Sequence, residues 1–291
     1  MKRFNEIYEE IYKNNNAELE KIRKSILKKI ILITVVAIIV ILYFIKDEGI
    51  CALAIMISMI VETIVITNNK GKYTKIFKSK VIETFVKNLD SNLNYYYDRG
   101  IAAAIYRKAE FEKFNIYSSE CLIEGLLDGK HLIKMAEVHT EKESKDSEGN
   151  SIYTLFHGIF GYIECSKDMG ITLKIRSDKR KKLKESKIEM DSDEFERNFD
   201  VYAENEVIAM QILTSDIMEM MIEFKEASKI KYELTIKQGH IYIRFYIGKV
   251  FEPKLFSRTL NYGMIKRYYD IIKFIFEISS KIATKINNIE I

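Results

Sequence analysis

The sequence is poor in the residues that staple small domains together. It has three cysteines in 291 residues, and none of them forms a C-x-x-C pair, which excludes a disulfide framework. Tryptophan is absent and Pro253 is the single proline, whereas isoleucine, lysine and asparagine are abundant. This composition indicates a bacterial chain from an AT-rich genome.

Motifs for common catalysis and cofactor binding are also missing. Gly125-x-x-x-Gly129-Lys130-His131 falls short of a phosphate-binding loop, which needs one more spacer and a Ser or Thr after the Lys to hold magnesium. The sequence has no G-x-G-x-x-G after a strand, no H-E-x-x-H and no G-x-S-x-G. The four histidines, His131, His139, His157 and His240, are scattered without the close pairing of zinc sites. We therefore predict no catalytic residue, no cofactor and no metal.

Two long apolar runs dominate the N-terminal part of the chain. They cover residues 30–45 and 50–66 and are joined only by Lys46-Asp47-Glu48-Gly49. Each run is about as long as the shorter membrane spans, and the short gap forces the second to return beside the first. We predict a transmembrane helical hairpin. A buried hairpin of a soluble protein and a cleaved signal peptide fit less well, because the flanks are basic and the segment before the first run is long.

The distribution of charge around the hairpin predicts its orientation. The basic residues before it are Lys21, Arg23, Lys24, Lys28 and Lys29, and those after it are Lys70, Lys72, Lys75, Lys78 and Lys80. The connecting loop has only Lys46, offset by Asp47 and Glu48. Since positive charge stays on the cytoplasmic side, we expect a multi-pass protein of the cell membrane with both termini in the cytoplasm.

Within the hairpin, Glu62 is the unusual residue, because an ionisable side chain in a span is a candidate functional residue. It lies about 6 Å from the cytoplasmic end of its run, a depth that it shares with Thr34. Ala54, Ser58 and Glu62 follow at four-residue steps and form a small, polar stripe. We expect intramembrane packing through Thr34, Ala54, Ser58 and Glu62, either between the two helices or on a second copy of the chain. Glu62 would bond to Thr34 or to a flanking lysine. Transport is the weaker alternative, since a single acid has no relay partner.

The periodicity of the remaining sequence divides it further. We predict an N-terminal amphipathic helix over 1–29, the hairpin over 30–67, a helical connector over 70–111 and a cytoplasmic α+β domain over 112–291. The Asn14-Asn15-Asn16 tract is expected to interrupt the N-terminal helix. The helix either simply continues into the first span or forms an amphipathic strip on the membrane surface or on a partner. The connector is expected to form one helix over 72–97 and a second over 101–111.

In the C-terminal domain, the apolar period changes from helical to two near Leu132. The predicted strands cover 132–139, 152–164, 171–176 (half-exposed) and 195–201, with a mobile loop over 141–150. Helices are expected over 204–213 and 215–227, the second opened by a capping box at Asp216 and Glu219. Residues 230–236 and 241–247 alternate around Gln238-Gly239 and predict a β-hairpin. A closing helix should cover 254–288. The fold class is α+β, with an antiparallel sheet and a long C-terminal helix.

The densest basic cluster lies in a predicted loop between strands. It comprises Arg176, Lys179, Arg180, Lys181, Lys182, Lys184 and Lys187. It is either a solvated loop or a contact to anionic lipid head groups, in which Lys179, Arg180, Lys181, Lys182 and Lys184 would take part. Nucleic acid is not expected as a partner, since no aromatic residues interleave with the basic residues of this cluster.

Several short motifs resemble one known family. They are Gly125-Leu126-Leu127-Asp128-Gly129, Phe156-His157-Gly158-Ile159-Phe160, the segment 195–202, the segment 209–221 and Phe251-Glu252-Pro253. Together they are similar to the uncharacterised bacterial membrane proteins of the DUF3137 family, although Asn205 and Ser215 depart from its pattern. The resemblance implies a membrane-tethered cytoplasmic α+β domain and implies no reaction.

Two functions follow as expectations. The first is a membrane-anchored cytoplasmic binding module that contacts membrane lipid or a membrane protein partner, or that self-associates through the hairpin. The alternative is a membrane-associated enzyme of unrecognised type. A pocket that gathers His157, Glu164, Asp200 or Glu204 would favour the enzyme.

Overall fold

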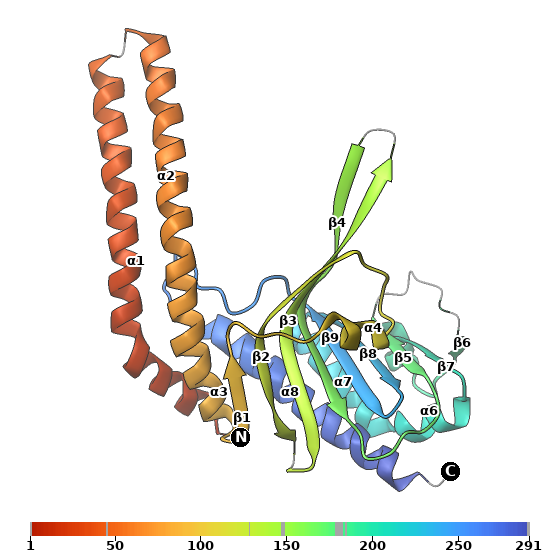
Figure 1. The fold of residues 1–291 in the computed structure, drawn as a ribbon. Helices are drawn as coiled ribbons and strands as arrows, with labels where there is room; N and C mark the ends of the chain where they lie inside the picture. Colours follow the sequence, from red (N-terminus) through yellow and green to blue (C-terminus); the bar gives the residue numbers. More distant parts are fainter. Residues whose placement is uncertain are drawn as a thin grey trace. The chain divides into compact units, whose positions relative to one another are not determined.

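The computed structural model describes residues 2–44, 46–127, 129–146, 149–177, 183 and 185–289 (Figure 1). The chain forms two compact units. The first contains Met1–Asn88 and Phe251–Ile265, and the second contains Leu89–Val250 and Lys266–Ile291.

Two long antiparallel helices make up most of the first unit (Figure 1). They are α1 (Phe4–Tyr43) and α2 (Glu48–Ile76), and α2 continues through a π-helical stretch, η1 (Phe77–Ile82), into α3 (Glu83–Leu89). Asp47 caps α2 by accepting a hydrogen bond from the Ile50 amide at 3.1 Å. The asparagine tract does not interrupt α1, because Asn15 is buried and its side-chain amide donates to the Ile11 carbonyl at 3.2 Å. The predicted interruption is therefore wrong, and the alternative of a helix that continues into the first apolar run is confirmed.

The segment 251–261 belongs to the first unit and is not helical, so the predicted start of the closing helix at residue 254 is wrong. The helix α8 (Tyr262–Asn288) begins eight residues later. The segment is held by polar contacts to the long helices instead of by helical hydrogen bonds. The Tyr8 hydroxyl donates to the Leu260 carbonyl at 3.2 Å, and the Tyr262 hydroxyl donates to Asn5 at 3.0 Å.

The described residues of the second unit form a nine-stranded antiparallel sheet in the order β1-β2-β3-β4-β9-β8-β5-β7-β6. The strands are β1 (Leu93–Tyr96), β2 (Ile116–Leu127), β3 (His131–Asp146), β4 (Gly149–Glu164), β5 (Leu173–Arg176), β6 (Ser186–Ile188), β7 (Asp200–Ala203), β8 (Lys231–Lys237) and β9 (His240–Tyr246). The shorter helices are α4 (Ala103–Lys108), α5 (Asp193–Asn198), α6 (Glu206–Ile212) and α7 (Ser215–Ser228). The predicted α+β class, with two apolar N-terminal helices, an antiparallel sheet and a long C-terminal helix, is confirmed.

The predicted β-hairpin of β8 and β9 is also confirmed. Gln238 and Gly239 both have positive φ, at 50° and 69°. Two consecutive left-handed residues make the tight turn whose twist matches that of paired strands. The helices α4, α6 and α7 form close to where the periodicity predicts them.

Several local predictions are wrong. Residues 93–96 pair as β1 instead of continuing a helix. The strand β2 lies where the periodicity predicts no strand. Most of the expected mobile loop over 141–150 is paired strand instead. The strand β3 continues to Asp146 and β4 begins at Gly149, with Glu141 opposite Thr154 and Lys142 opposite Tyr153. The expected strand over 195–201 divides into α5 and the start of β7. Finally, α7 begins after Thr214, whose hydroxyl donates to Asp216, so the predicted capping box is not what starts it.

The two faces of the sheet bury different chemistry. One face packs aromatic side chains against α7 and α8, where the rings of Phe224 and Phe274 stack at 4.0 Å. Tyr232 and Phe245 from β8 and β9 contact both rings. The other face is covered by residues 101–114, which bury Tyr106 and Phe111 against Phe156, Phe160 and Tyr242. Arg176 of β5, Glu233 of β8 and Arg244 of β9 are buried in this part of the sheet.

Candidate functional site

The apolar surface of α1 and α2 is largely uncovered. The most apolar 18-residue windows of these helices are 6% and 0% buried, and both helices are long and apolar enough to cross a membrane. Leu32, Leu42 and Met59 are each more than 60% exposed. A contiguous apolar patch of this kind indicates contact with lipid or with a partner.

The predicted packing residues lie on the facing sides of the two helices. The Thr34 hydroxyl donates to Glu62 Oε1 at 2.8 Å and also contacts its own helix at the Ile30 carbonyl. Ala54 and Ser58 line an apolar groove of about 440 Å³ together with Val36 and Ala37. The structure thus brings Thr34 and Glu62 into contact and places Ala54 and Ser58 beside the first helix. Their role inside a membrane stays a prediction.

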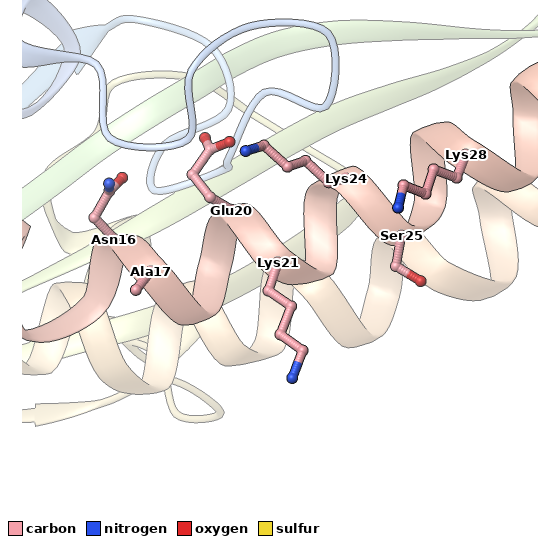
Figure 2. Close-up of a pocket in the computed structure, with 7 residues that line it drawn as sticks. All are labelled: Asn16, Ala17, Glu20, Lys21, Lys24, Ser25 and Lys28. Atoms are coloured by element: carbon pink, nitrogen blue, oxygen red, sulfur yellow. The ribbon is translucent and has the colours of Figure 1, made fainter.

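A polar cavity of about 650 Å³ lies along α1, just before its apolar run (Figure 2). Its lining residues are Asn16, Ala17, Glu20, Lys21, Lys24, Ser25 and Lys28. The three lysines are exposed, and we call Lys21, Lys24 and Lys28 the α1 lysine surface. Figure 2 shows Lys24 pointing back along the helix toward Glu20, while Lys21 extends away from it. The three ammonium groups lie within about two and a half helical turns of the apolar run, an arrangement that suits an anionic ligand.

Glu20 anchors the wall of this cavity. It accepts hydrogen bonds from Arg23 at 2.8 Å and from the amide and hydroxyl of Thr259 at 3.1 and 3.0 Å. The Thr259 hydroxyl also meets the Tyr73 hydroxyl at 2.6 Å. The bond from Arg23, with those from Thr259, outweighs burial and lowers the pKa of Glu20 to about 2. We call Glu20, Arg23, Tyr73 and Thr259 the Glu20 clasp, since they hold segment 251–261 on α1 and α2.

The residues predicted to contact lipid from the sheet domain, Lys179, Arg180, Lys181, Lys182 and Lys184, lie outside the described residues. The two ends of that basic cluster are described, and both have partners within the chain. Arg176 is buried and donates to Glu233 at 2.8 Å. The ammonium of Lys187 lies 2.9 Å from Asp200. The prediction of a half-exposed strand over 171–176 is wrong, because every residue of β5 is buried.

Arg244 is the centre of a buried ion network on the same face of the sheet. Its guanidinium donates to Glu233 at 2.7 Å, to the Tyr106 hydroxyl at 2.7 Å and to Glu112. Burial opposes its charge, but Glu233, Tyr106 and Glu112 outweigh it and raise the pKa of Arg244. Phe111 stacks on the guanidinium at 4.3 Å. Each described ionic group of this network has its charge compensated within the protein, so we interpret it as structural.

The prediction that the histidines lie scattered is wrong for His139 and His157. His139 and His157 lie opposite each other on β3 and β4, and their rings stack at 4.4 Å. His157 Nε2 lies 2.9 Å from Glu137 Oε1. Burial, followed by the neighbouring His157, lowers the pKa of His139. The two rings line a polar cavity of about 320 Å³ with Ser118, Ser119, Glu120, Glu137 and Lys249.

The residues that would favour an enzyme are not brought together. His157 contacts Glu137, whereas Glu204 accepts a bond from the Thr172 amide at 3.0 Å. Glu164 lies seven residues along β4 from His157, roughly 23 Å in an extended strand. Asp200 is on β7, four strands away from β4 in the sheet. These four side chains therefore do not share one pocket.

Comparison with known protein families finds a match for part of the chain. Residues 154–283 match the model of a family described as "Protein of unknown function (DUF3137)". This part of the chain resembles the DUF3137 family. The match contains the Phe156-His157-Gly158 motif on β4, the hairpin of β8 and β9, and most of α8. The predicted resemblance is therefore confirmed.

A comparison with solved structures finds a match of low similarity. It is the crystal structure of the mycobacterial trehalose monomycolate transport factor A, TtfA, which is 8% identical. The likeness covers 68% of this chain and 96% of that chain, with a TM-score of 0.36. No curated protein matches the chain.

Proposed function

We propose that this protein is a membrane-anchored binding module. Residues 30–45 and 50–66 cross the cell membrane as a helical hairpin, and both termini lie in the cytoplasm with the nine-stranded sheet. The exposed apolar surface of α1 and α2 carries this proposal, since their apolar windows are 6% and 0% buried within the chain. Lipid is the environment in which such a surface is stable, and it is continuous over the length that a span requires.

The proposed orientation rests on charge. Lys21, Lys24 and Lys28 are exposed on α1 before the first run, and Lys72 and Lys75 follow the second. Asp47 and Glu48 occupy the loop, where Asp47 caps α2. Basic residues are retained in the cytoplasm during insertion, so the loop is the part that crosses.

For the ligand, we propose anionic lipid head groups at the α1 lysine surface. The cavity of about 650 Å³ along α1 is large enough for a phosphate-bearing head group, and its lysines precede the apolar run directly. Each basic residue near a membrane surface contributes roughly 1 kcal/mol of attraction to anionic lipid. Within the Glu20 clasp, the charge of Arg23 offsets the charge of Glu20, so the net charge of this stretch of α1 stays positive. Residues 179–184 would add a second contact from the sheet domain.

The absence of tryptophan makes the spanning proposal directly testable. Ile38 and Ile57 are about half exposed near the middle of the two runs. We expect the fluorescence of Ile38→Trp and Ile57→Trp to be quenched by lipids brominated deep in their acyl chains, in vesicles that contain the full chain. Tyr153→Trp, at an exposed position on β4, is the control and should be quenched by aqueous iodide instead. Iodide quenching at positions 38 and 57 would refute the hairpin.

The orientation has a separate test. In a background with Cys51 and Cys165 replaced by serine, we expect a membrane-impermeant maleimide to label Glu48→Cys on intact cells. Glu9→Cys, at an exposed position of α1, should be labelled only after lysis. Labelling of Glu9→Cys on intact cells would reverse the topology.

The lipid proposal is tested with matched charge changes. We expect phosphatidylglycerol to raise the thermal unfolding temperature of the full chain in detergent more than phosphatidylcholine does. Replacing Lys21, Lys24 and Lys28 with Gln should abolish that difference. Replacing the exposed Lys142, Lys231 and Lys273 with Gln removes the same charge from the second unit. The difference between the two lipids should then remain. An equal effect of both triple variants would show that net charge, and not the α1 lysine surface, governs the response. A third variant, with residues 179–184 neutralised, measures the contribution of that loop.

A further inference from the structure

Two carboxylates and a thiol meet on the sheet at a point that the proposed membrane function does not use. Glu120 on β2 lies directly opposite Glu137 on β3. Directly opposed residues of an antiparallel pair project from the same face, and two like charges there repel each other. Glu137 is only 5% exposed, so water screens this repulsion poorly. A cation between the two carboxylates would convert the repulsion into attraction.

An irregularity in β2 adds the thiol to this pair. Neighbouring residues of a regular strand point to opposite faces, which would direct Cys121 away from Glu120. The register of β2 on β3 shifts between Glu120 and Ile123, and Cys121 has a φ of 60° within that bulge. A bulge turns consecutive side chains toward one side. As a result, one ligand atom from each of Glu120, Cys121 and Glu137 lies within 4.8 Å of the others.

The surroundings provide orientation and access. His157 Nε2 lies 2.9 Å from Glu137 Oε1, and the stacked ring of His139 fixes the plane of the imidazole. A ligating carboxylate is commonly held in this way by a neighbouring polar group. The cavity of about 320 Å³ that these residues line gives an ion a route from solvent. Cys121 is fully buried.

We propose that Glu120, Cys121 and Glu137 bind a divalent transition-metal ion, with His157 orienting the Glu137 carboxylate. Zinc fits this donor set best, because a thiolate selects against magnesium and calcium, and carboxylate oxygens are accepted alongside it. Tetrahedral zinc, with bonds of about 2.0–2.3 Å, separates its ligand atoms by roughly 3.3–3.8 Å, so the three ligand atoms would move closer together when the ion binds. The cavity leaves a fourth position for solvent. This inference is independent of membrane anchoring.

The lining of the cavity by Lys249 suggests how the ion is regulated. An ammonium near two carboxylates competes with a metal ion for them. Removing this charge should therefore tighten metal binding, so Lys249→Gln is the variant in which we expect a gain. A purely structural cluster would show no such gain.

The test uses the full chain in detergent, without an affinity tag, after treatment with a chelator. We expect Co²⁺ to bind with a stoichiometry of one and to give the ultraviolet charge-transfer band of a cobalt–thiolate bond, and we expect Zn²⁺ to displace it. Cys121→Ser should abolish the band. Cys165→Ser is the matched control and should retain it, since Cys165 is not one of the clustered ligand residues. His157→Gln should weaken binding by about 10- to 100-fold.

Two further measurements keep the result interpretable if Cys121→Ser folds poorly. Glu120 is exposed, so Glu120→Gln should preserve the near-ultraviolet circular dichroism of the wild type and still lose tight Co²⁺ binding. A wild-type chain that binds no Co²⁺, or a band that survives Cys121→Ser and vanishes in Cys165→Ser, would overturn the proposal.

Discussion

Thr34 donates a hydrogen bond to Glu62 across the two helices of the hairpin, with 2.8 Å between Thr34 Oγ1 and Glu62 Oε1. The bond joins residues 28 positions apart and satisfies an acidic group within an apolar surface. In the proposed membrane hairpin, a hydrogen bond of this kind contributes about 0.6 kcal/mol on average and up to about 1.7 kcal/mol.

We therefore predict a measurable coupling between these two positions. In a double-mutant cycle with Thr34→Val and Glu62→Leu, the coupling free energy should be about 0.6–1.7 kcal/mol, from unfolding of the full chain in detergent. Glu62→Gln keeps an acceptor and should retain most of it. Ser58→Ala is the control, since Ser58 bonds to Ile55 of its own helix and should show no coupling with Thr34. Strictly additive effects of Thr34→Val and Glu62→Leu would show that this hydrogen bond does not stabilise the packing of the two helices.

A second prediction concerns the buried network of Arg244. Replacing Arg244 with Met keeps much of its volume but leaves Glu112 and Glu233 buried without their principal cation. Removing one partner of a buried pair costs about 3–5 kcal/mol. We expect this loss in urea unfolding followed by near-ultraviolet circular dichroism. Lys266→Met breaks the exposed pair with Asp270 on α8 and should cost only about 0.3–0.5 kcal/mol. Similar costs for both variants would mean that water reaches Arg244.

The network also shows what local sequence patterns cannot contain. Along β8 and β9, apolar residues alternate with Glu233, Thr235 and Arg244, which is the pattern of a half-exposed strand. All three polar residues are buried, because residues 101–114 cover that face from a distant part of the chain. The hairpin itself was predictable, since its pairing depends on neighbouring residues and on the turn at Gln238-Gly239. Burial by a distant segment leaves no mark on local periodicity.

The polar cavity was missed for a related reason. His139 and His157 are 18 residues apart in the sequence, and only the register of β3 on β4 brings their rings together. The ends of those strands are rich in Glu, Lys, Ser and Asp, so residues 141–150 have the composition of a loop. Cys121 joins Glu120 through a bulge, which shifts the side-chain alternation that a sequence reading assumes. A pattern of opposed acids and paired histidines becomes visible only once the register is known.

A third prediction follows from the Glu20 clasp. The bond from Arg23, with those from Thr259, lowers the pKa of Glu20 from 4.5 to about 2. A lowered pKa in the folded state stabilises the protein above pH 4.5, and this contribution is lost as the pH falls toward 2. Glu20→Gln should therefore be less stable than wild type by about 1.5–3 kcal/mol at neutral pH, the usual worth of hydrogen bonds to a charged group.

The difference between the two proteins should shrink as the pH falls from 4.5 toward 2. Thermal unfolding of both, followed by circular dichroism across this range, measures it. Glu18→Gln is the control. It breaks the exposed pair between Glu18 of α1 and Lys80 of η1 and should cost less than about 1 kcal/mol. A difference between wild type and Glu20→Gln that stays constant down to pH 2 would show that the clasp does not depend on the charge of Glu20.

The last prediction tests the close approach of β4 and β9. A Cβ atom added at Gly158 would overlap the Phe245 carbonyl oxygen of the neighbouring strand, which is backbone and cannot rotate away. Gly158→Ala should therefore separate β4 from β9 and cost about 4 kcal/mol or more, or prevent folding. Gly71→Ala is the matched control in α2, where the added Cβ meets nothing within 4 Å. It should stabilise the helix by about 0.5–1 kcal/mol. Comparing the two variants by thermal unfolding and by hydrogen exchange in β4 and β9 separates a steric clash from a general response to alanine, and wild-type protection of β9 in Gly158→Ala would contradict this pairing.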